Sequence, residues 1–170
     1  MTFEQFVETL GLTHFSAEEL LTKTTNAENE PPPAEIWEQI APTILIVQEV
    51  RTRFDRAIRF NSVYRNIPYN RRVGGVKLSP HIAFCAVDFR TTNETVLAEM
   101  YHYLNGRAGS WIDAPRRFAR SQVTVDGEAI SQQPLEWRRQ GGQEQFMFRG
   151  GLSLYSTFIH LDTRGFDARW

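Results

Sequence analysis

The sequence has little of several features that mark specialised classes of protein. A single cysteine, Cys85, stands among 170 residues, which excludes an internal disulfide and a cysteine-based zinc site. No apolar run approaches the roughly 20 residues of a membrane span, so we expect none. The net charge of −1 gives no overall field that attracts nucleic acid, and no nucleic-acid partner is expected. The start Met-Thr-Phe-Glu-Gln lacks the basic character of a conventional export signal, so we expect a soluble protein that something else must deliver outside the cytoplasm.

What is present is ordinary for a globular protein, and it predicts one domain. Hydrophobic residues make up 41% of the chain and 170 residues can enclose a real core without disulfides. The polar stretch 22–30 and the prolines after it read as a surface connection, too short to divide the chain. We therefore expect a monomeric single domain over residues 1–170. Residues 1–33 would form an N-terminal helix and connection, and residues 34–170 the core.

Capping patterns and apolar spacing predict the helices. Ser16-Ala-Glu-Glu19 is a capping box that starts a short helix. Residues 36–54 carry apolar side chains at steps of three and four, which predicts a long amphipathic helix broken or kinked at Pro42. A further helix is expected over residues 93–105, capped by its first residue or the threonine before it. Residues 67–78 read as a loop that bends at its two glycines.

The remaining apolar runs favour β-strands. Asp126-Gly127 between apolar flanks predicts a hairpin within residues 122–130. Further strands are expected over residues 58–63, 82–89, 145–148 and 157–161. Cys85 falls in the second of these, where a buried and inert thiol is expected.

The histidines are the natural candidates for metal ligands, because catalytic zinc takes three ligands from His, Asp or Glu and keeps one position for water. They are His14, His81, His102 and His160. The first and third are expected to have surface or packing roles. His81 precedes the strand whose far end carries Asp88, although a His–Asp pair seven residues apart is weak evidence alone. His160 and Asp162 share a strand face, so a pocket could hold the histidine on a metal with the carboxylate beside it.

The surrounding residues form an ordered set of motifs. They are Ser62-Val-Tyr-Arg65, Tyr69-Asn70, Val73-Gly74-Gly75, Ser79-Pro-His81, Ala86-Val87-Asp88, Gly150-Gly151, Tyr155, Phe158-Ile159-His160 and Asp162-Thr163-Arg164. This set resembles the M15 metallopeptidases, which include D-alanyl-D-alanine carboxypeptidases, L-alanyl-D-glutamate endopeptidases of phage lysins and related murein endopeptidases. It is most similar to the branch with a final His-x-Asp-Thr motif. The resemblance implies a hedgehog/DD-peptidase-like α+β fold, a small antiparallel sheet with flanking helices, and zinc on His81, Asp88 and His160.

The resemblance also implies catalytic roles, and two positions depart from it. Arg65 falls where the family places an arginine that grips the substrate carboxylate or carbonyl, a task suited to a planar fork of donors. Phe84 replaces a glycine that the family usually has, and is expected to crowd the strand and narrow the cleft. Thr157 stands where many members carry an acidic general base. Asp162 is therefore expected to accept the proton, unless it orients a ligand histidine instead or hydrolysis has been lost.

These expectations lead to zinc-assisted hydrolysis of peptide bonds in peptidoglycan stem peptides, by a carboxypeptidase or an endopeptidase. Zinc would lower the pKa of bound water and polarise the scissile carbonyl. The protein would act at the bacterial cell wall or periplasm if delivered there. One rival is a zinc-containing but non-catalytic module of a phage or cell-envelope assembly that binds wall peptides, which Thr157 and Phe84 favour. The other is a metal-free structural domain.

Overall fold

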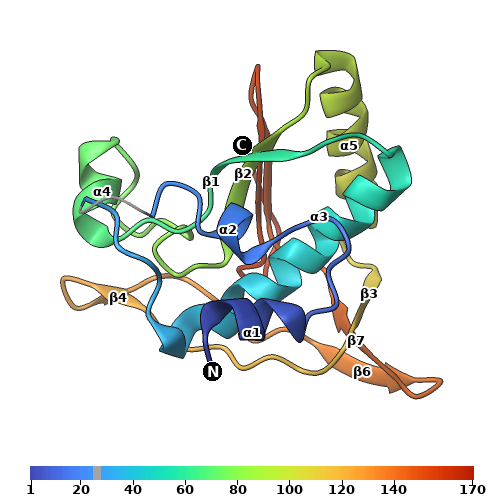
Figure 1. Cartoon of the computed structure of the whole chain (residues 1–170), viewed down its shortest axis with the longest axis horizontal. Coiled ribbons are helices and arrows are strands. Elements are labelled where there is room, and N and C mark those ends of the chain that lie inside the picture. Colours follow the sequence, from blue (N-terminus) through green and yellow to red (C-terminus); the bar gives the residue numbers. More distant parts are fainter. Residues whose placement is uncertain (25–27) are drawn as a thin grey trace.

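Helices and strands mix along the chain in the computed structural model, which describes residues 1–24 and 28–170 (Figure 1). Residues 25–27, part of the expected surface connection, lie outside the described residues. The helices are α1 (Phe3–Glu8), α2 (Ala17–Leu20), the 3₁₀ helix η1 (Ala34–Ile40), α3 (Ala41–Phe54), α4 (Ile67–Arg72) and α5 (Glu94–Arg107). The predicted α+β class is confirmed.

The strands form a five-stranded sheet, a three-stranded sheet and a two-stranded hairpin. The larger sheet has the order β1-β2-β9-β8-β10, antiparallel except for the last pair. Its members are β1 (Arg59–Ser62), β2 (Ala86–Arg90), β8 (Gly151–Leu154), β9 (Ile159–Asp162) and β10 (Ala168–Arg169). The smaller sheet pairs β7 (Gln143–Met147) with β3 (Trp111–Ala114) and β6 (Trp137–Gln140), while β4 (Thr124–Val125) pairs with β5 (Glu128–Ala129).

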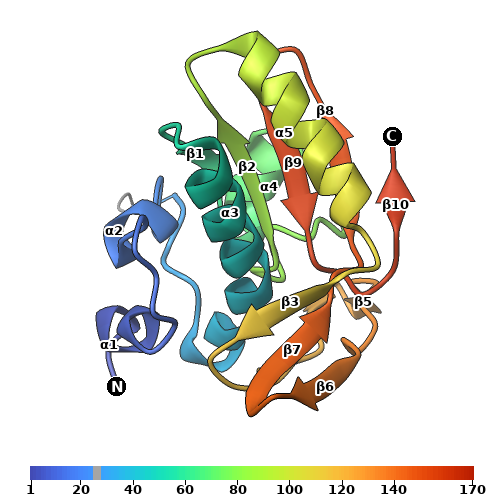
Figure 2. The same ribbon diagram turned by 90° about the vertical axis from the view of Figure 1, so that its right-hand side faces the viewer.

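The main core lies between the larger sheet and the helices α3 and α5. Both helices cover the same face of this sheet, whereas α4 lies on its other side (Figures 1 and 2). Buried side chains from the two helices and the sheet join in one cluster, which includes Ile44, Val47, Val50, Leu97, Met100, Leu104, Val87, Phe89, Ile159 and Leu161. Each such side chain contributes about 1.5–3 kcal/mol when it is fully buried. Alternate residues of β2 and β9 therefore face away from the helices.

Several helix predictions hold, and one region was wrongly read as a loop. The capping box of Ser16 is present at α2, and Asn93 caps α5. The 36–54 segment is helical but begins as the 3₁₀ helix η1, and Pro42 lies in the first turn of α3. Residues 67–72 are helical because Asn66 caps α4 and Pro68 sits in its first turn, where a missing N–H costs nothing.

The strand predictions were right in the interior of the sheet and incomplete elsewhere. The 58–63 run contains β1, and the Asp126-Gly127 hairpin is confirmed, with both residues at positive φ. The 82–89 run becomes a strand only from Ala86. Helix α1 and strands β3, β6, β8 and β10 were not predicted. None of the described helices combines the length and apolar character that crossing a membrane requires.

Phe84 occupies a left-handed backbone position of the kind that favours glycine, the residue that the resemblance leads us to expect there. Its φ is 55°, in the left-handed region, which costs a residue with a side chain roughly 1–2 kcal/mol. The ring is fully buried and packs against Tyr64 and Phe3 at centroid distances of 5.7 and 6.0 Å. The prediction that Phe84 narrows the cleft is wrong, because the turn before β2 directs this side chain into the main core.

Candidate metal centre

A row of polar side chains crosses the larger sheet on the face opposite α3 and α5. Ser62 in β1 pairs with Asp88 in β2, Asp88 pairs with His160 in β9, and His160 pairs with Ser153 in β8. The residues on either side of Asp88 and His160 in their strands belong to the main core. Strand alternation therefore places these two predicted ligands side by side, away from the helices.

His81 reaches the same point from the turn that precedes β2. Its carbonyl accepts a hydrogen bond from the Arg65 amide at 3.2 Å, and its ring Nδ1 lies 2.7 Å from the carbonyl oxygen of Val63. Because a carbonyl can only accept, Nδ1 carries the proton and Nε2 presents a lone pair. The histidine is buried, with 2% of its surface exposed. Two backbone contacts thus fix both the position and the tautomer of this ring.

The three predicted ligands lie close enough to share one ion. One donor atom from each of His81, Asp88 and His160 falls within 4.8 Å of the others. Oδ1 of Asp88 lies 3.2 Å from Nε2 of His81 and 2.9 Å from Nδ1 of His160. Nε2 of His81 is buried and receives no hydrogen bond from a described residue. Two imidazole nitrogens and a carboxylate oxygen are a donor set typical of zinc, so the residues fit the metal.

The three buried side chains of the cluster differ in their ionisation. Burial lowers the pKa of His81 and keeps its ring neutral, against the pull of Asp88. Burial would raise the pKa of Asp88, but the two neighbouring histidines lower it well below its usual range. Burial opposes charge on His160, yet its hydrogen bonds to Asp162 and Asp88 raise its pKa. Without a metal, the anionic carboxylate of Asp88 therefore lies between a neutral His81 ring and a His160 ring whose raised pKa favours the protonated form.

Asp162 lies on the side of His160 away from Asp88. Its Oδ2 is 2.9 Å from Nε2 of His160, whereas Asp88 contacts the other ring nitrogen. The remaining bonds to this carboxylate come from the amide of Gly151 and from the amide, Nε and Nη2 of Arg164. Asp162 is fully buried, and these partners lower its pKa although burial opposes this. The geometry favours the alternative in which Asp162 orients His160, and its role as a base stays a prediction.

Arg65 stands beside the three ligands at the wall of a cavity of about 370 Å³. Its Nη2 donates to Oδ2 of Asp88 at 3.0 Å, and its Nε donates to Ser62 at 2.8 Å. The cavity contains His81, Asp88 and His160, so the predicted substrate-gripping arginine does lie next to the ligand cluster. The side chain is 17% exposed, which leaves it accessible from the cavity.

Aromatic residues form the other wall of this cavity, and sequence reasoning gave them no role. Tyr155 and Phe158 stack at the β8–β9 turn with their ring centroids 4.4 Å apart. The ring of Trp170 lies 5.1 Å from that of His160 and donates from Nε1 to the hydroxyl of Tyr155 at 2.8 Å. Tyr155 and Phe158 belong to the motif set, but the contacts of Trp170 join residues distant in the sequence, and no motif pointed toward them.

Thr157 is exposed in the turn between β8 and β9 and does not line the cavity. Among the described side chains that line it, only that of Asp88 is a carboxylate. The histidines expected to stay outside the site do so, since His14 and His102 are exposed. Cys85 is buried as predicted, and burial raises the pKa of its thiol to about 12.

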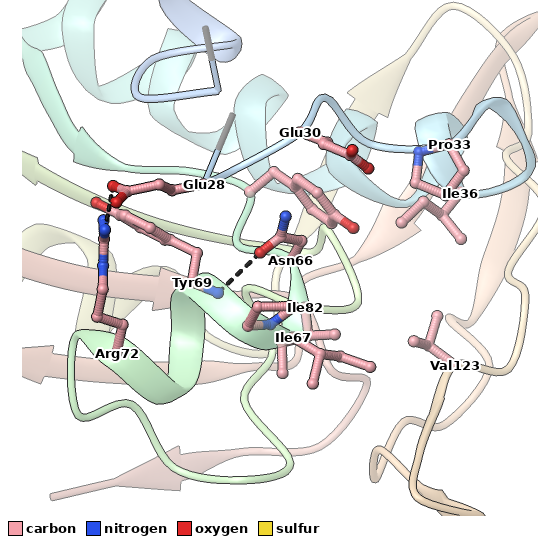
Figure 3. A pocket seen from close by; sticks show the side chains of 12 residues that line it. Glu28, Glu30, Pro33, Ile36, Asn66, Ile67, Tyr69, Arg72, Ile82 and Val123 are labelled. Carbon is pink, nitrogen blue, oxygen red and sulfur yellow. Dashed lines mark hydrogen bonds and ion pairs between the residues drawn. The ribbon is translucent and has the colours of Figure 1, made fainter. Parts of the chain in front are cut away.

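A larger cavity, of about 630 Å³, lies on the other side of the segments that carry Arg65 and His81. Figure 3 shows its apolar side chains from η1, α4 and the turn before β2, and the ion pair between Glu28 and Arg72 at its edge. Residues that are adjacent in the chain line different cavities. Tyr64 and Ile82 line this one, whereas Arg65 and His81 line the smaller one. The described residues of its wall include no histidine, so the chemistry belongs to the smaller cavity.

Comparison with known proteins agrees with the motif and the ligand cluster. The family described as Peptidase M15 matches residues 13–110, more than half of the chain. The matched region contains Arg65, His81 and Asp88 and ends before His160. No curated protein and no solved structure matched the chain. Since the match spans most of the chain, this protein belongs to the M15 peptidase family.

Proposed function

We propose that this protein is a zinc peptidase that hydrolyses peptide bonds in peptidoglycan stem peptides. The observation that carries the proposal is the unpartnered Nε2 of His81, which faces Asp88 and His160 at the floor of a cavity in a member of the M15 family. His81, Asp88 and His160 would hold the metal, through Nε2, the carboxylate and Nδ1. Bound there, zinc supplies a lowered pKa for a water molecule and polarisation of the scissile carbonyl.

The other side chains of the site position the ligands and the substrate. Asp162 accepts the proton of Nε2 of His160 and fixes the plane of the ring, so that Nδ1, which faces Asp88, can bind a cation when it gives up its proton. Arg65 lies next to Asp88 and can turn its remaining donors toward a substrate carbonyl or carboxylate. The rings of Tyr155, Phe158 and Trp170 line the cavity beside these groups.

Digestion of purified peptidoglycan and synthetic stem peptides, followed by mass spectrometry, tests the activity and identifies the bond. The zinc-loaded protein is expected to release D-alanine or to cut the L-alanyl-D-glutamate bond, and the apoprotein to do neither. An Asp88→Asn variant is the matched control, because it keeps the shape of the ligand and removes its charge. Equal product from wild type and this control would contradict the proposal.

A second function is favoured by one observation, the lack of a second carboxylate in the described cavity wall. Thr157 cannot accept a proton near neutral pH, and Asp162 is engaged by five hydrogen bonds. Under this alternative the protein is a zinc-containing module that binds wall peptides without cutting them. Tight zinc and peptide binding without any product in the digestion above would establish it.

A further inference from the structure

The larger cavity has the size and lining of a small-ligand site. Its volume of about 630 Å³ falls within the range of roughly 300–1,000 Å³ that is usual for such sites. Figure 3 shows that its apolar side chains come from separate parts of the chain, with Ile36 in η1, Ile67 in α4 and Val123 in the segment before β4. Pro33, Pro68 and Ile82 complete this apolar lining, which suits a ligand with an apolar body.

Hydrogen bonds hold the wall of this cavity in place. The buried side chain of Asn29 accepts from the amide of Asn66 at 2.9 Å and donates to the carbonyl of Tyr64 at 3.0 Å. The side chain of Asn66 accepts from the amide of Tyr69 at 2.8 Å and so caps α4. Since these bonds tie the segment before η1 to the start of α4, the cavity is formed before a ligand arrives.

The charged side chains of the wall leave one carboxylate in excess. Glu28 and Arg72 form an ion pair with each other at the edge of the cavity (Figure 3). Glu30 also lines the cavity, is exposed, and makes no ion pair or hydrogen bond with a described residue. Because a lone carboxylate beside an apolar surface attracts positive charge, the wall favours a cationic ligand over a neutral or anionic one.

Tyr64 adds a second polar group to the same wall. Its hydroxyl makes no hydrogen bond to a described residue and is not enclosed. Burial raises the pKa of this phenol, and the charge of Glu30 raises it further, so the hydroxyl stays neutral and its oxygen can accept a hydrogen bond. An ammonium group offers three donors, which can serve both a carboxylate and a hydroxyl.

We propose that the larger cavity binds an amphiphilic amine, a molecule with an apolar body of several carbon atoms and an ammonium head. The body packs against Ile67, Ile82 and Val123, the ammonium pairs with Glu30, and the hydroxyl of Tyr64 is a further acceptor. None of these residues is a proposed metal ligand, so this site is separate from the proposed peptidase chemistry.

A series of simple probes tests the site on the full chain. They are butylammonium, hexylammonium and octylammonium, with hexanol and hexanoate as molecules of matched length and different charge. Methyl NMR measures each affinity from the signals of Ile67, Ile82 and Val123. Affinity should rise by roughly 4-fold with each added methylene that is buried. Hexylammonium should bind about 3-fold tighter than hexanol or more, a modest factor because Glu30 is exposed, and hexanoate should bind most weakly.

Glu30→Gln removes the charge and keeps the shape of the side chain. In this variant hexylammonium and hexanol should bind about equally, while the affinity for hexanol stays as in wild type. Glu35→Gln is the matched control, because Glu35 is an exposed carboxylate of η1 that does not line the cavity. The preference for the ammonium should survive there.

Three results would overturn the proposal. One is the lack of saturable binding of octylammonium, and another is a preference for the ammonium that persists in Glu30→Gln. The third is a set of shifts confined to Val76 and Leu78, which line the smaller cavity and would report an amine bound at the metal centre. None of these measurements depends on turnover, so the failure of the peptidase proposal and the failure of this one are distinguishable.

Discussion

His81 and Asp88 face each other at 3.2 Å, measured from ring Nε2 to carboxylate Oδ1, yet no hydrogen bond joins these atoms. The proton of the ring is held on Nδ1 by the carbonyl of Val63, so the unprotonated Nε2 lies beside an anionic oxygen. Two buried acceptors so close together are unfavourable unless a cation lies between them. A metal ion bound between these two atoms would therefore remove an unfavourable contact that the fold imposes.

Metal content is the first test. Protein purified without a chelator is expected to contain about one zinc per chain, and His81→Ala to retain little, because a site with two protein ligands binds weakly. The measurement is elemental analysis, with circular dichroism to show that the variant folds. His102→Ala serves as the control, since His102 is exposed on α5. Full zinc occupancy in His81→Ala would remove this residue from the site.

Asp162→Asn separates the two roles that Asp162 can play. With Asp162 on the outer nitrogen of His160, the amide should weaken zinc affinity by about 10–100-fold, because the ring loses its orienting acceptor. If Asp162 is instead the general base, metal affinity should hold while turnover falls by roughly 100-fold or more. Competition with a chromogenic chelator measures the affinity, and peptide hydrolysis measures the turnover. Unchanged zinc affinity would contradict the orienting role.

Arg65→Lys should fold and bind zinc as wild type does, while turnover falls by about 10-fold or more. Lysine keeps the charge but cannot reach Ser62 and Asp88 at once while presenting further donors. Steady-state kinetics on stem peptides check this. Arg59→Lys is a control from β1, the strand that precedes Arg65, since Arg59 is exposed. Wild-type turnover in Arg65→Lys would exclude a role on the substrate.

At position 84 we expect a glycine variant to be more stable than an alanine variant, which is the reverse of the usual order. Removing the buried ring costs about 3–5 kcal/mol, as for other buried aromatic residues. Glycine also relieves the positive φ, so Phe84→Gly should be more stable than Phe84→Ala by roughly 1 kcal/mol. Elsewhere glycine is usually the less stable of the two. Denaturant unfolding of both variants measures the order, and a less stable glycine variant would show that the turn is unstrained.

Glu49 predicts how stability depends on pH. Burial raises its pKa, but hydrogen bonds from Arg107 and Tyr103 outweigh this and lower it below the usual value. Since the folded pKa is below the unfolded one, the stabilisation is present above the ordinary pKa of a glutamate and is lost as pH falls through the lowered value. Glu49→Gln should cost about 1 kcal/mol at neutral pH, a figure reduced for partial exposure. The difference from wild type should shrink in acid below about pH 4.

Unfolding curves of wild type and Glu49→Gln between neutral pH and pH 3 give this difference. Glu99→Gln on the exposed face of α5 is the control and should change little. A difference between wild type and Glu49→Gln that grows as the pH falls would contradict the prediction.

The candidate ligands were predicted from the family resemblance of the ordered motifs. The spacing of His81 and Asp88 alone is weak evidence, and the strand face that His160 shares with Asp162 only allowed a metal site. The positions of Trp170 and Arg164 relative to His160 depend on how β8, β9 and β10 pair, which no periodicity in the chain encodes. The helix at 67–72 was missed because Pro68 reads as a breaker, although Asn66 before it supplies a cap. Nothing in the residue types alone reveals that Phe84 turns inward, since its direction follows from the positive φ.

Because Asp88 pairs with His160 across β2 and β9, the relative position of these two side chains depends on the same strand register as the packing of the core. Their chain neighbours Val87 and Leu161 fill the other face, and a slip of one residue would exchange the two faces of a strand. A one-residue shift of β2 or β9 would therefore turn a polar side chain of the site into the apolar core. The same shift would separate Asp88 from His160. The register that buries the apolar side chains thus also keeps Asp88 and His160 opposite each other.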